Sequence, residues 1–260
     1  MLLKHTIYKK IDQGKINRIL NTPIEMTIIL TVQGNIAAGK STFVESLRQQ
    51  YQGNARVCFL QEPVDEWSTI TDENGKSMLA LFYGDQKRYA FSFQMMAYIS
   101  RLALLKRAIA KGYDIIITER SLETDRQIFA KMLYNDGKIA SVEYQIYLKW
   151  FDEFKRDFPD ENVIYVKTSP EISAQRVTKR GREGEIIPLE YLQKCHDYHE
   201  HWIETIPKEN LCVIDGNIDT DLFPNALVAW KTQVDNFVKT RLTDLHKSRE
   251  NIHDPYVVGC

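Results

Sequence analysis

The chain has 260 residues, of which 43% are hydrophobic, and its 34 basic and 35 acidic residues leave a formal net charge of −1. This size and apolar content suffice for one large domain or two small ones. The near-neutral charge argues against an extended nucleic-acid-binding surface, which needs a basic excess. No segment is apolar enough to span a bilayer, so we expect no membrane partner.

The compartment is predicted from the cysteines and from the N-terminal segment. The four cysteines lie far apart without a CxxC pair, which favours reduced thiols in a cytoplasmic setting. Residues 1–25 are mildly basic but contain Asp12 and few arginines or serines. This composition fits a polar extension better than a mitochondrial presequence, so a mitochondrial location is the less favoured alternative.

Short β-branched runs alternate with amphipathic helical patterns along the rest of the chain. The predicted strands are 27–32, 55–60, 114–118, 162–166 and 211–214, and the predicted helices are 40–52, 86–111, 122–134, 141–157, 170–180, 188–206 and about 221–244. This alternation predicts an α/β fold in which helices flank both faces of a five-stranded parallel sheet. The folded domain should span 26–245, followed by a polar tail over 246–260. Ligands of such folds bind beyond the carboxyl ends of the strands.

The first strand end carries the sequence "GNIAAGKS", which satisfies G-x-x-x-x-G-K-[ST] between a strand and a helix. In this phosphate-binding loop (P-loop), backbone N–H groups would hold the donor phosphates, Lys40 would reach the β and γ oxygens, and Ser41 would ligate Mg²⁺. An accidental glycine-rich turn is disfavoured by that context. The predicted phosphate contacts are Gly34, Asn35, Ile36, Ala37, Ala38, Gly39, Lys40, Ser41 and Thr42.

Carboxylates follow the second and third strands. Glu62 in "FLQEPVDEW" is suited to act as a general base toward an attacking hydroxyl, or it is merely a solvated or helix-capping residue. After the third strand, Glu119 could bind Mg²⁺ and Arg120 could neutralise charge at the reacting oxygens. A structural Glu–Arg pair is the alternative. The residues alone leave both alternatives open.

The segment "TSPEISAQRVTKRGRE" has the signature of a helix start, with Ser169 as N-cap and Pro170 in the first turn. Arg176 and Arg180 share one helix face, and Arg182 follows on the loop. We interpret these three arginines as a helical lid over the transferring phosphates. A solvated basic face is the alternative.

Taken together, these motifs resemble the deoxynucleoside kinase family, in particular its deoxycytidine and deoxyguanosine kinase branch. The similarity runs over about 27–240, through "GNIAAGKSTFV", "EPVDEW", "RYAFSFQ", "ERS…DRQIFA" and "RGRE…IPLEYL". The resemblance implies a P-loop kinase fold, transfer of phosphate from ATP or another triphosphate to the 5′-hydroxyl of a deoxynucleoside, Mg²⁺ and a homodimer. It also favours Glu62 as the catalytic base.

The resemblance further implies a pocket for the nucleoside. Gln94 would bond the Watson–Crick edge of the base, and Tyr83 would hold the sugar 3′-hydroxyl together with Glu185. Because "RGREGEIIP" is one residue shorter than the family pattern, Glu183 is an alternative to Glu185. The other predicted pocket residues line or stack on the base: Ile36, Trp67, Leu79, Phe93, Ala97 and Phe129.

Helix geometry independently places Gln94 and Arg101 about 20° apart on one face, with the small Ala97 beside them. A charged residue on an otherwise apolar helix needs a partner, and Asp125 is the candidate for Arg101. Alternatively, the pair is a salt bridge with a purely structural role. At the base edge, such a pair should favour cytosine or a purine over thymine.

Three other functions are alternatives to this one. A nucleoside monophosphate kinase would need arginines for the phosphate of its acceptor, and Gln61 stands where thymidylate kinases typically have arginine before the glutamate. A non-catalytic nucleotide-binding protein would not need Lys40, Glu62 and Glu119 together with the lid arginines. A thymidine-preferring or broad-specificity deoxynucleoside kinase differs from the predicted enzyme only in its base pocket.

Overall fold

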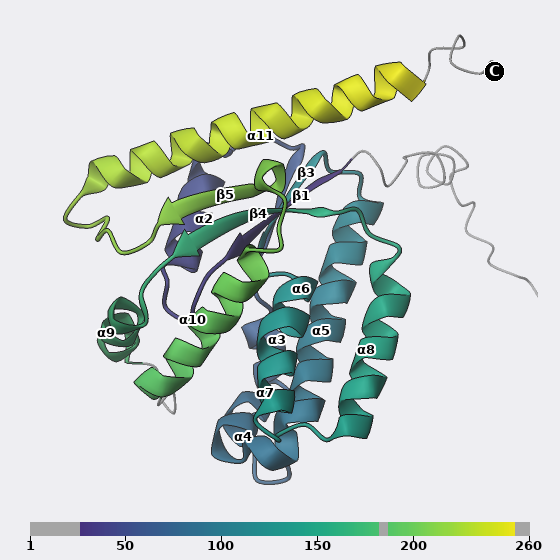
Figure 1. The fold of residues 1–260 in the computed structure, drawn as a ribbon, viewed down its shortest axis with the longest axis vertical. Coiled ribbons are helices and arrows are strands. Elements are labelled where there is room, and N and C mark those ends of the chain that lie inside the picture. Colours follow the sequence, from purple (N-terminus) through teal and green to yellow (C-terminus); the bar gives the residue numbers. More distant parts are fainter. Residues whose placement is uncertain (1–26, 182–186, 253–260) are drawn as a thin grey trace, which may run out of the picture.

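The computed structural model describes residues 27–181 and 187–252 (Figure 1). Five strands form one parallel sheet in the order β2-β3-β1-β4-β5. Their bounds are β1 Ile28–Gln33, β2 Val57–Leu60, β3 Ile115–Glu119, β4 Glu161–Lys167 and β5 Leu211–Asp215. β2, β3 and β1 are neighbours, so the three strand ends with predicted site residues lie at one edge of the sheet. The predicted α/β fold is confirmed.

Alternate residues of β1 face two separate apolar cores, one on each side of the sheet. Leu30 packs in the core covered by helix α2 (Lys40–Gln50) and helix α11 (Pro224–Ile252). Ile29 packs in the core covered by α5 (Gln86–Ala110) and α8 (Ser141–Lys155). In Figure 1, α11 crosses one side of the sheet, whereas α5 and α8 extend from the other. Burial of apolar surface on both faces holds the sheet in place.

The remaining helices surround the carboxyl edge of the sheet. They are α3 Val64–Ser68, α4 Met78–Gly84, α6 Leu122–Thr124, the π-helix η2 Asp125–Ala130, α7 Lys131–Asn135, α9 Pro170–Arg180, α10 Leu189–Ile203 and the 3₁₀ turn η3 Lys208–Asn210. The signature at α9 is confirmed, because the Ser169 side chain accepts a hydrogen bond from the Ile172 N–H at 3.3 Å. Gly181 ends the helix in a left-handed conformation with φ 57°.

Three differences from the sequence-based expectation concern local structure. The helix expected over 122–134 contains the π-helix, and the short helices α3 and α4 lie in segments without a helical prediction. The last helix begins at Pro224, after a turn closed by the Phe223 N–H on the Asp219 carbonyl at 2.8 Å. It continues to Ile252 rather than ending near 244, so 246–252, assigned to a polar tail, are helical.

The helix runs on because Trp230, Val234 and Val238, four residues apart, anchor α11 on the sheet, and Leu242 and Leu245 continue the same packing beyond them. Within the part of the chain that the structure describes, no helix has both the length and the hydropathy needed to cross a bilayer.

Candidate active site

A cavity of about 750 Å³ opens at the carboxyl edge of the sheet. It is lined by most of the predicted site residues: Ile36, Ala37, Ala38, Gly39, Lys40, Ser41, Thr42, Glu62, Trp67, Leu79, Tyr83, Phe93, Gln94, Ala97, Glu119, Arg120, Asp125, Phe129, Arg176 and Arg180. Gly34, Asn35 and Arg101 lie behind this lining. Arg182 and both candidate glutamates, Glu183 and Glu185, lie outside the described residues.

The P-loop has a backbone conformation that its glycines make accessible. Gly34 has a φ of 145°, and a Cβ there would lie 2.6 Å from the Val166 carbonyl oxygen. The Asn35 side chain donates to the Leu192 carbonyl at 2.9 Å, which ties the loop to α10. Gly39, with φ 95°, is the N-cap of α2. The positive end of the α2 dipole therefore faces the cavity, as an anion site requires.

Lys40 is buried at the floor of this loop and donates to the Asn35 carbonyl at 2.7 Å. Burial and the neighbouring Arg120 lower the pKa of Lys40 to about 7, although Glu119 acts in the opposite direction. A polyphosphate in the cavity would favour the charged ammonium, because an opposite charge nearby raises the pKa of a lysine.

The Ser41 hydroxyl donates to a Glu119 carboxylate oxygen at 2.7 Å, so the two predicted metal ligands meet at the cavity wall. A hydroxyl and a carboxylate are hard oxygen donors of the kind that Mg²⁺ prefers, and phosphate oxygens and water complete such sites. Among the described residues there is no cluster of three or more histidines, cysteines or carboxylates that could hold a metal alone. The pair therefore fits Mg²⁺ bound together with phosphates.

Arg120 sits between the phosphate loop and the predicted base. Its φ of 62° is unusual for a residue with a side chain and directs the chain sharply away from β3. Its guanidinium donates to the Gly34 carbonyl at 3.4 Å, lies 3.6 Å from Glu62 and stacks over the Phe129 ring at 4.8 Å. A fixed positive charge is thus held between the P-loop, which forms one half of the cavity, and an aromatic slot, which forms the other half.

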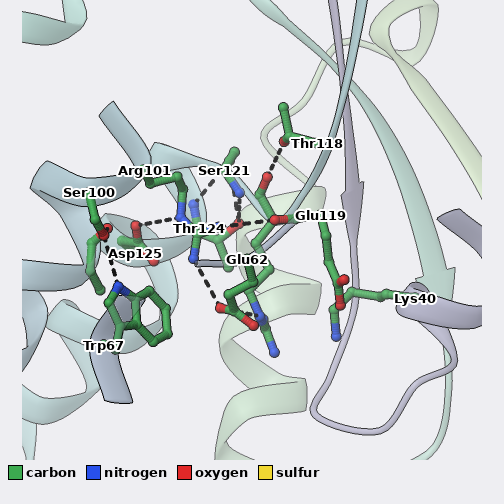
Figure 2. A network of polar contacts seen from close by, with 12 residues as sticks. Lys40, Glu62, Trp67, Ser100, Arg101, Thr118, Glu119, Ser121, Thr124 and Asp125 are labelled. Carbon is green, nitrogen blue, oxygen red and sulfur yellow. Dashed lines mark hydrogen bonds and ion pairs between the residues drawn. The ribbon is translucent and has the colours of Figure 1, made fainter. Parts of the chain in front are cut away.

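The Glu62 carboxylate faces this junction with about a quarter of its side chain exposed. Arg101 donates to it at 3.0 Å, as Figure 2 shows. Withdrawal from water alone would raise the pKa of Glu62, but Arg120, Arg101 and Lys40 outweigh it and lower the pKa below its ordinary value. Glu62 is therefore ionised at neutral pH and able to accept a proton.

The other half of the cavity is an aromatic slot. Phe93 stacks on Phe82 with ring centroids 4.5 Å apart and meets Trp67 edge-on at 5.6 Å. The Trp67 indole N–H donates to Ser100 at 2.8 Å, which fixes its ring. Gln94, only 2% exposed, has a side-chain oxygen without a hydrogen-bond partner. An unpaired buried amide is costly, so the slot is suited to a flat ligand with polar edge groups.

Asp125 enters the slot from the π-helix η2, and Arg101 donates to it at 3.0 Å. Burial raises the pKa of Asp125 above its ordinary value, whereas Arg101 acts to lower it. Single π-helical turns recur at functional sites because the added residue changes which side chains face inward. Here the turn carries both Asp125 and Phe129 into the cavity lining.

A sequence profile of the deoxynucleoside kinase family matches residues 30–239. The chain belongs to the deoxynucleoside kinase family. It is 31% identical over 234 residues to human "Thymidine kinase 2, mitochondrial", covering 89% of this chain and 80% of that protein. It is 37% identical over 193 residues to human "Deoxycytidine kinase", covering 67% and 74%. With "Deoxyguanosine kinase, mitochondrial" of Xenopus laevis the identity is 31% over 261 residues, covering 90% and 97%.

Membership identifies the chain as a phosphotransferase that acts on deoxynucleosides, and its motifs are those of a P-loop kinase. The three relatives are named for three different nucleosides. Family membership therefore gives the reaction class, and the base preference has to be argued from the pocket.

The arginines of this kinase on α9 differ in their surroundings. Arg176 donates to three backbone carbonyls, those of Ala38 at 3.3 Å, Gly216 at 2.8 Å and Ile218 at 3.4 Å. It therefore joins the P-loop to the turn after β5. Arg180 is exposed at the cavity. The two arginines that the sequence grouped as one lid hence have different environments.

The end of the cavity formed after β5 was not predicted from the sequence. The missed lining residues include Tyr191 of α10, Trp230 of α11, and Asn217, Ile218, Asp219, Thr220 and Asp221. The rule that ligands bind beyond strand ends could have found the turn, since "DGNIDTD" directly follows the fifth predicted strand. Tyr191 and Trp230 carried no comparable signal, because aromatic residues on helices are usually core residues.

Proposed function

We propose that this kinase transfers the γ-phosphoryl group of ATP, or of another nucleoside triphosphate, to the 5′-hydroxyl of a deoxynucleoside in nucleotide salvage, and so supplies DNA precursors. The observation that supports this most is the continuity of the cavity. The P-loop lies in one half, the aromatic slot with Gln94 in the other, and Glu62 at the junction between them.

In this mechanism the 5′-oxygen attacks the γ-phosphorus, its proton passes to the Glu62 carboxylate, and the bond from the γ-phosphorus to the β–γ bridging oxygen breaks to release the nucleoside diphosphate. P-loop amides, Lys40 and Arg120 stabilise the negative charge on the transferring and leaving phosphates. Ser41 and Glu119 would hold Mg²⁺, which when bound neutralises phosphate charge. Arg180, with Arg182 on the following segment, would approach the same phosphates. General-base assistance of this kind is worth about 10²–10⁴ in rate.

For the acceptor, the proposal favours deoxycytidine or a purine deoxynucleoside over thymidine. The Gln94 amide, whose oxygen is unpaired, would bond the base edge, with Phe93 and Phe129 stacking on the ring. Beyond Gln94, the Asp125 carboxylate can accept from the amino group of cytosine or adenine. Thymine offers a carbonyl oxygen there, and the unmade hydrogen bond costs about 1–3 kcal/mol. Tyr83 would hold the sugar 3′-hydroxyl, together with Glu185 or Glu183.

We also propose a homodimer formed through helix α8. Four apolar side chains spaced four residues apart on α8 are exposed: Val142 by 63%, Ile146 by 41%, Trp150 by 43% and Phe154 by 40%. Ile99 of the neighbouring α5 adds a further exposed apolar side chain (51%). An apolar stripe of this kind marks a protein interface. Sedimentation of Ile146→Glu should give a monomer where the unsubstituted chain gives a dimer.

The cytoplasmic location stays a prediction.

The experiment that tests the proposed function is ADP release from ATP with each of the four deoxynucleosides and each of their monophosphates. We expect release with the nucleosides, fastest with deoxycytidine or a purine deoxynucleoside. Release with monophosphates alone would indicate a nucleoside monophosphate kinase. No acceptor-dependent release would indicate a non-catalytic nucleotide-binding protein. Thymidine as the best acceptor would overturn the proposed base preference but not the reaction.

A further inference from the structure

Arg101 connects two acidic side chains that have different tasks in the proposed mechanism. Its Nε donates to Asp125 at 3.0 Å, one terminal nitrogen donates to Glu62 at 3.0 Å, and the other donates to the Glu119 backbone carbonyl at 3.0 Å. Figure 2 shows the guanidinium between Asp125 and Glu62. Of these contacts, only the one with Asp125 was predicted from the sequence.

Arg101 also lies behind the wall of the nucleoside cavity rather than in it. Gln94 and Asp125 line the large cavity, whereas Arg101 lines a separate internal cavity of about 20 Å³ between α5 and the sheet. Its side chain is 8% exposed. A residue so enclosed acts on a bound nucleoside through its neighbours, and one of those neighbours is the predicted catalytic base.

We propose that Arg101 is a positioning residue for Glu62, which fixes the orientation and the ionisation of the general base, and that its pairing with Asp125 couples this task to the base pocket. The inference rests on the proposed function in that Glu62 is the base there. Planar guanidinium groups are suited to this, because their several N–H donors point in fixed directions toward separate acceptors.

The electrostatic consequence follows from the charges around Glu62. Lys40 from α2, Arg120 after β3 and Arg101 from α5 all favour the carboxylate, and Asp125 from η2 faces Glu62 across Arg101. Partial withdrawal from water opposes them. Removing Arg101 therefore raises the pKa of Glu62. A base must be ionised to accept a proton, so activity would then be lost at a higher pH as the solution is acidified.

The test compares the pH dependence of kcat/KM in Arg101→Met, Asp125→Ala and the unsubstituted enzyme. We expect the acidic limb of Arg101→Met to move up by about one pH unit or more, the usual effect of one adjacent opposite charge. Its kcat should fall by a similar factor for every accepted nucleoside. Asp125→Ala removes a negative charge that faces Glu62, so its limb should lie at or below that of the unsubstituted enzyme, and the KM for the nucleoside should change. Superimposable limbs in all three enzymes would overturn the inference.

Arg101→Lys provides a second test in case the methionine variant fails to fold. It retains a positive charge near Glu62 but cannot make all of the contacts of a guanidinium, so its acidic limb should lie between the other two. A limb in the lysine variant at or above that of Arg101→Met would contradict the proposal. Thermal melting of each variant separates these effects from a change in stability.

A readout without turnover separates this inference from the proposed function. Carboxyl ¹³C NMR titration, with Glu62→Gln to assign the resonance, gives the pKa of Glu62 directly in the unsubstituted chain and in Arg101→Met. A higher pKa in the variant supports the inference even if no deoxynucleoside is phosphorylated. An unchanged pKa overturns it even if the enzyme is active as proposed.

Discussion

The two halves of the cavity are built in different ways. The phosphate half is a single stretch of backbone between β1 and α2, shaped by glycines at positive φ and by one buried lysine. The nucleoside half is assembled from side chains of α3, α4, α5 and η2, which are distant in sequence. The first binds a group common to all triphosphates, and the second has to distinguish one base from another.

Phosphate binding and base discrimination are therefore encoded differently in the sequence. Backbone amides at a helix N-terminus bind phosphate whatever the surrounding side chains are, so the local motif suffices. Base discrimination depends on the partners of a few buried polar groups, here Gln94, Asp125 and Arg101, and those partners come from tertiary packing. Substitutions in the two halves should therefore have separable effects.

The largest effect is expected at the junction. Glu62→Gln should lower kcat by about 10²–10⁴ while the nucleoside KM stays nearly unchanged, because the amide cannot accept the proton. Steady-state kinetics measure this. Glu66→Gln, an exposed residue of the same short helix region, is the matched control and should be unaffected. A Glu62→Gln enzyme with the kcat of the unsubstituted enzyme would remove Glu62 from the mechanism.

Within the phosphate half, the two arginines of α9 should respond differently to substitution. Arg180→Ala should lower kcat on the order of 10- to 100-fold, the loss expected for a hydrogen bond to a charged group, and should lower Tm less than Arg176→Ala does, because Arg180 is exposed. Arg176→Ala should lower Tm and raise the KM for ATP, because it frees carbonyls of the P-loop and of the turn after β5. If melting shows instead that Arg180 supports stability and not turnover, its role is structural.

In the nucleoside half, the double variant Arg101→Met with Asp125→Ala should shift the ratio of kcat/KM for thymidine over deoxycytidine upward by about 5- to 150-fold. Use of the ratio cancels any loss through Glu62 that both nucleosides share. Competition between the two nucleosides in one reaction gives it directly. A ratio that stays the same, or that falls, would show that the charged pair does not select the base.

The smallest effect concerns the shape of the P-loop. Gly34→Ala should destabilise the fold by about 1–3 kcal/mol, because its Cβ would lie 2.6 Å from the Val166 carbonyl oxygen at a φ of 145°. Gly75→Ala is the matched control, since Gly75 also has a positive φ of 77° but nothing within 4 Å of the added Cβ. Equal changes in Tm for the two variants would show that the close approach to β4 is not limiting.

Much of the fold and of the phosphate half could be predicted from the sequence. The strands are short apolar runs, and the P-loop, Glu62, Glu119 and Arg120 all follow strand ends, which parallel topology gathers at one edge. The π-helix could not be predicted, because 122–134 has an ordinary helical pattern and a single wider turn leaves no signature in that pattern.

The contacts of the arginines were beyond prediction for a related reason. Sequence spacing places Arg101 on the face of Gln94 but does not reveal that Glu62 lies within its reach. Likewise, the helical pattern places Arg176 beside Arg180 but does not show that carbonyls of two loops converge on it. Long, flexible side chains take their direction from whichever acceptors the fold supplies.

If the cavity presents a deoxynucleoside 5′-hydroxyl to the donor phosphate at Glu62, as we propose, the product is a 5′-monophosphate. The most direct test is proton-coupled ³¹P NMR of the product formed from ATP and deoxycytidine. A 5′-monophosphate gives a triplet, because its phosphorus couples to both protons on the 5′-carbon, and we expect this triplet, absent with Glu62→Gln over the same time. A doublet from a 3′-monophosphate, or phosphate released only to water, would contradict the account.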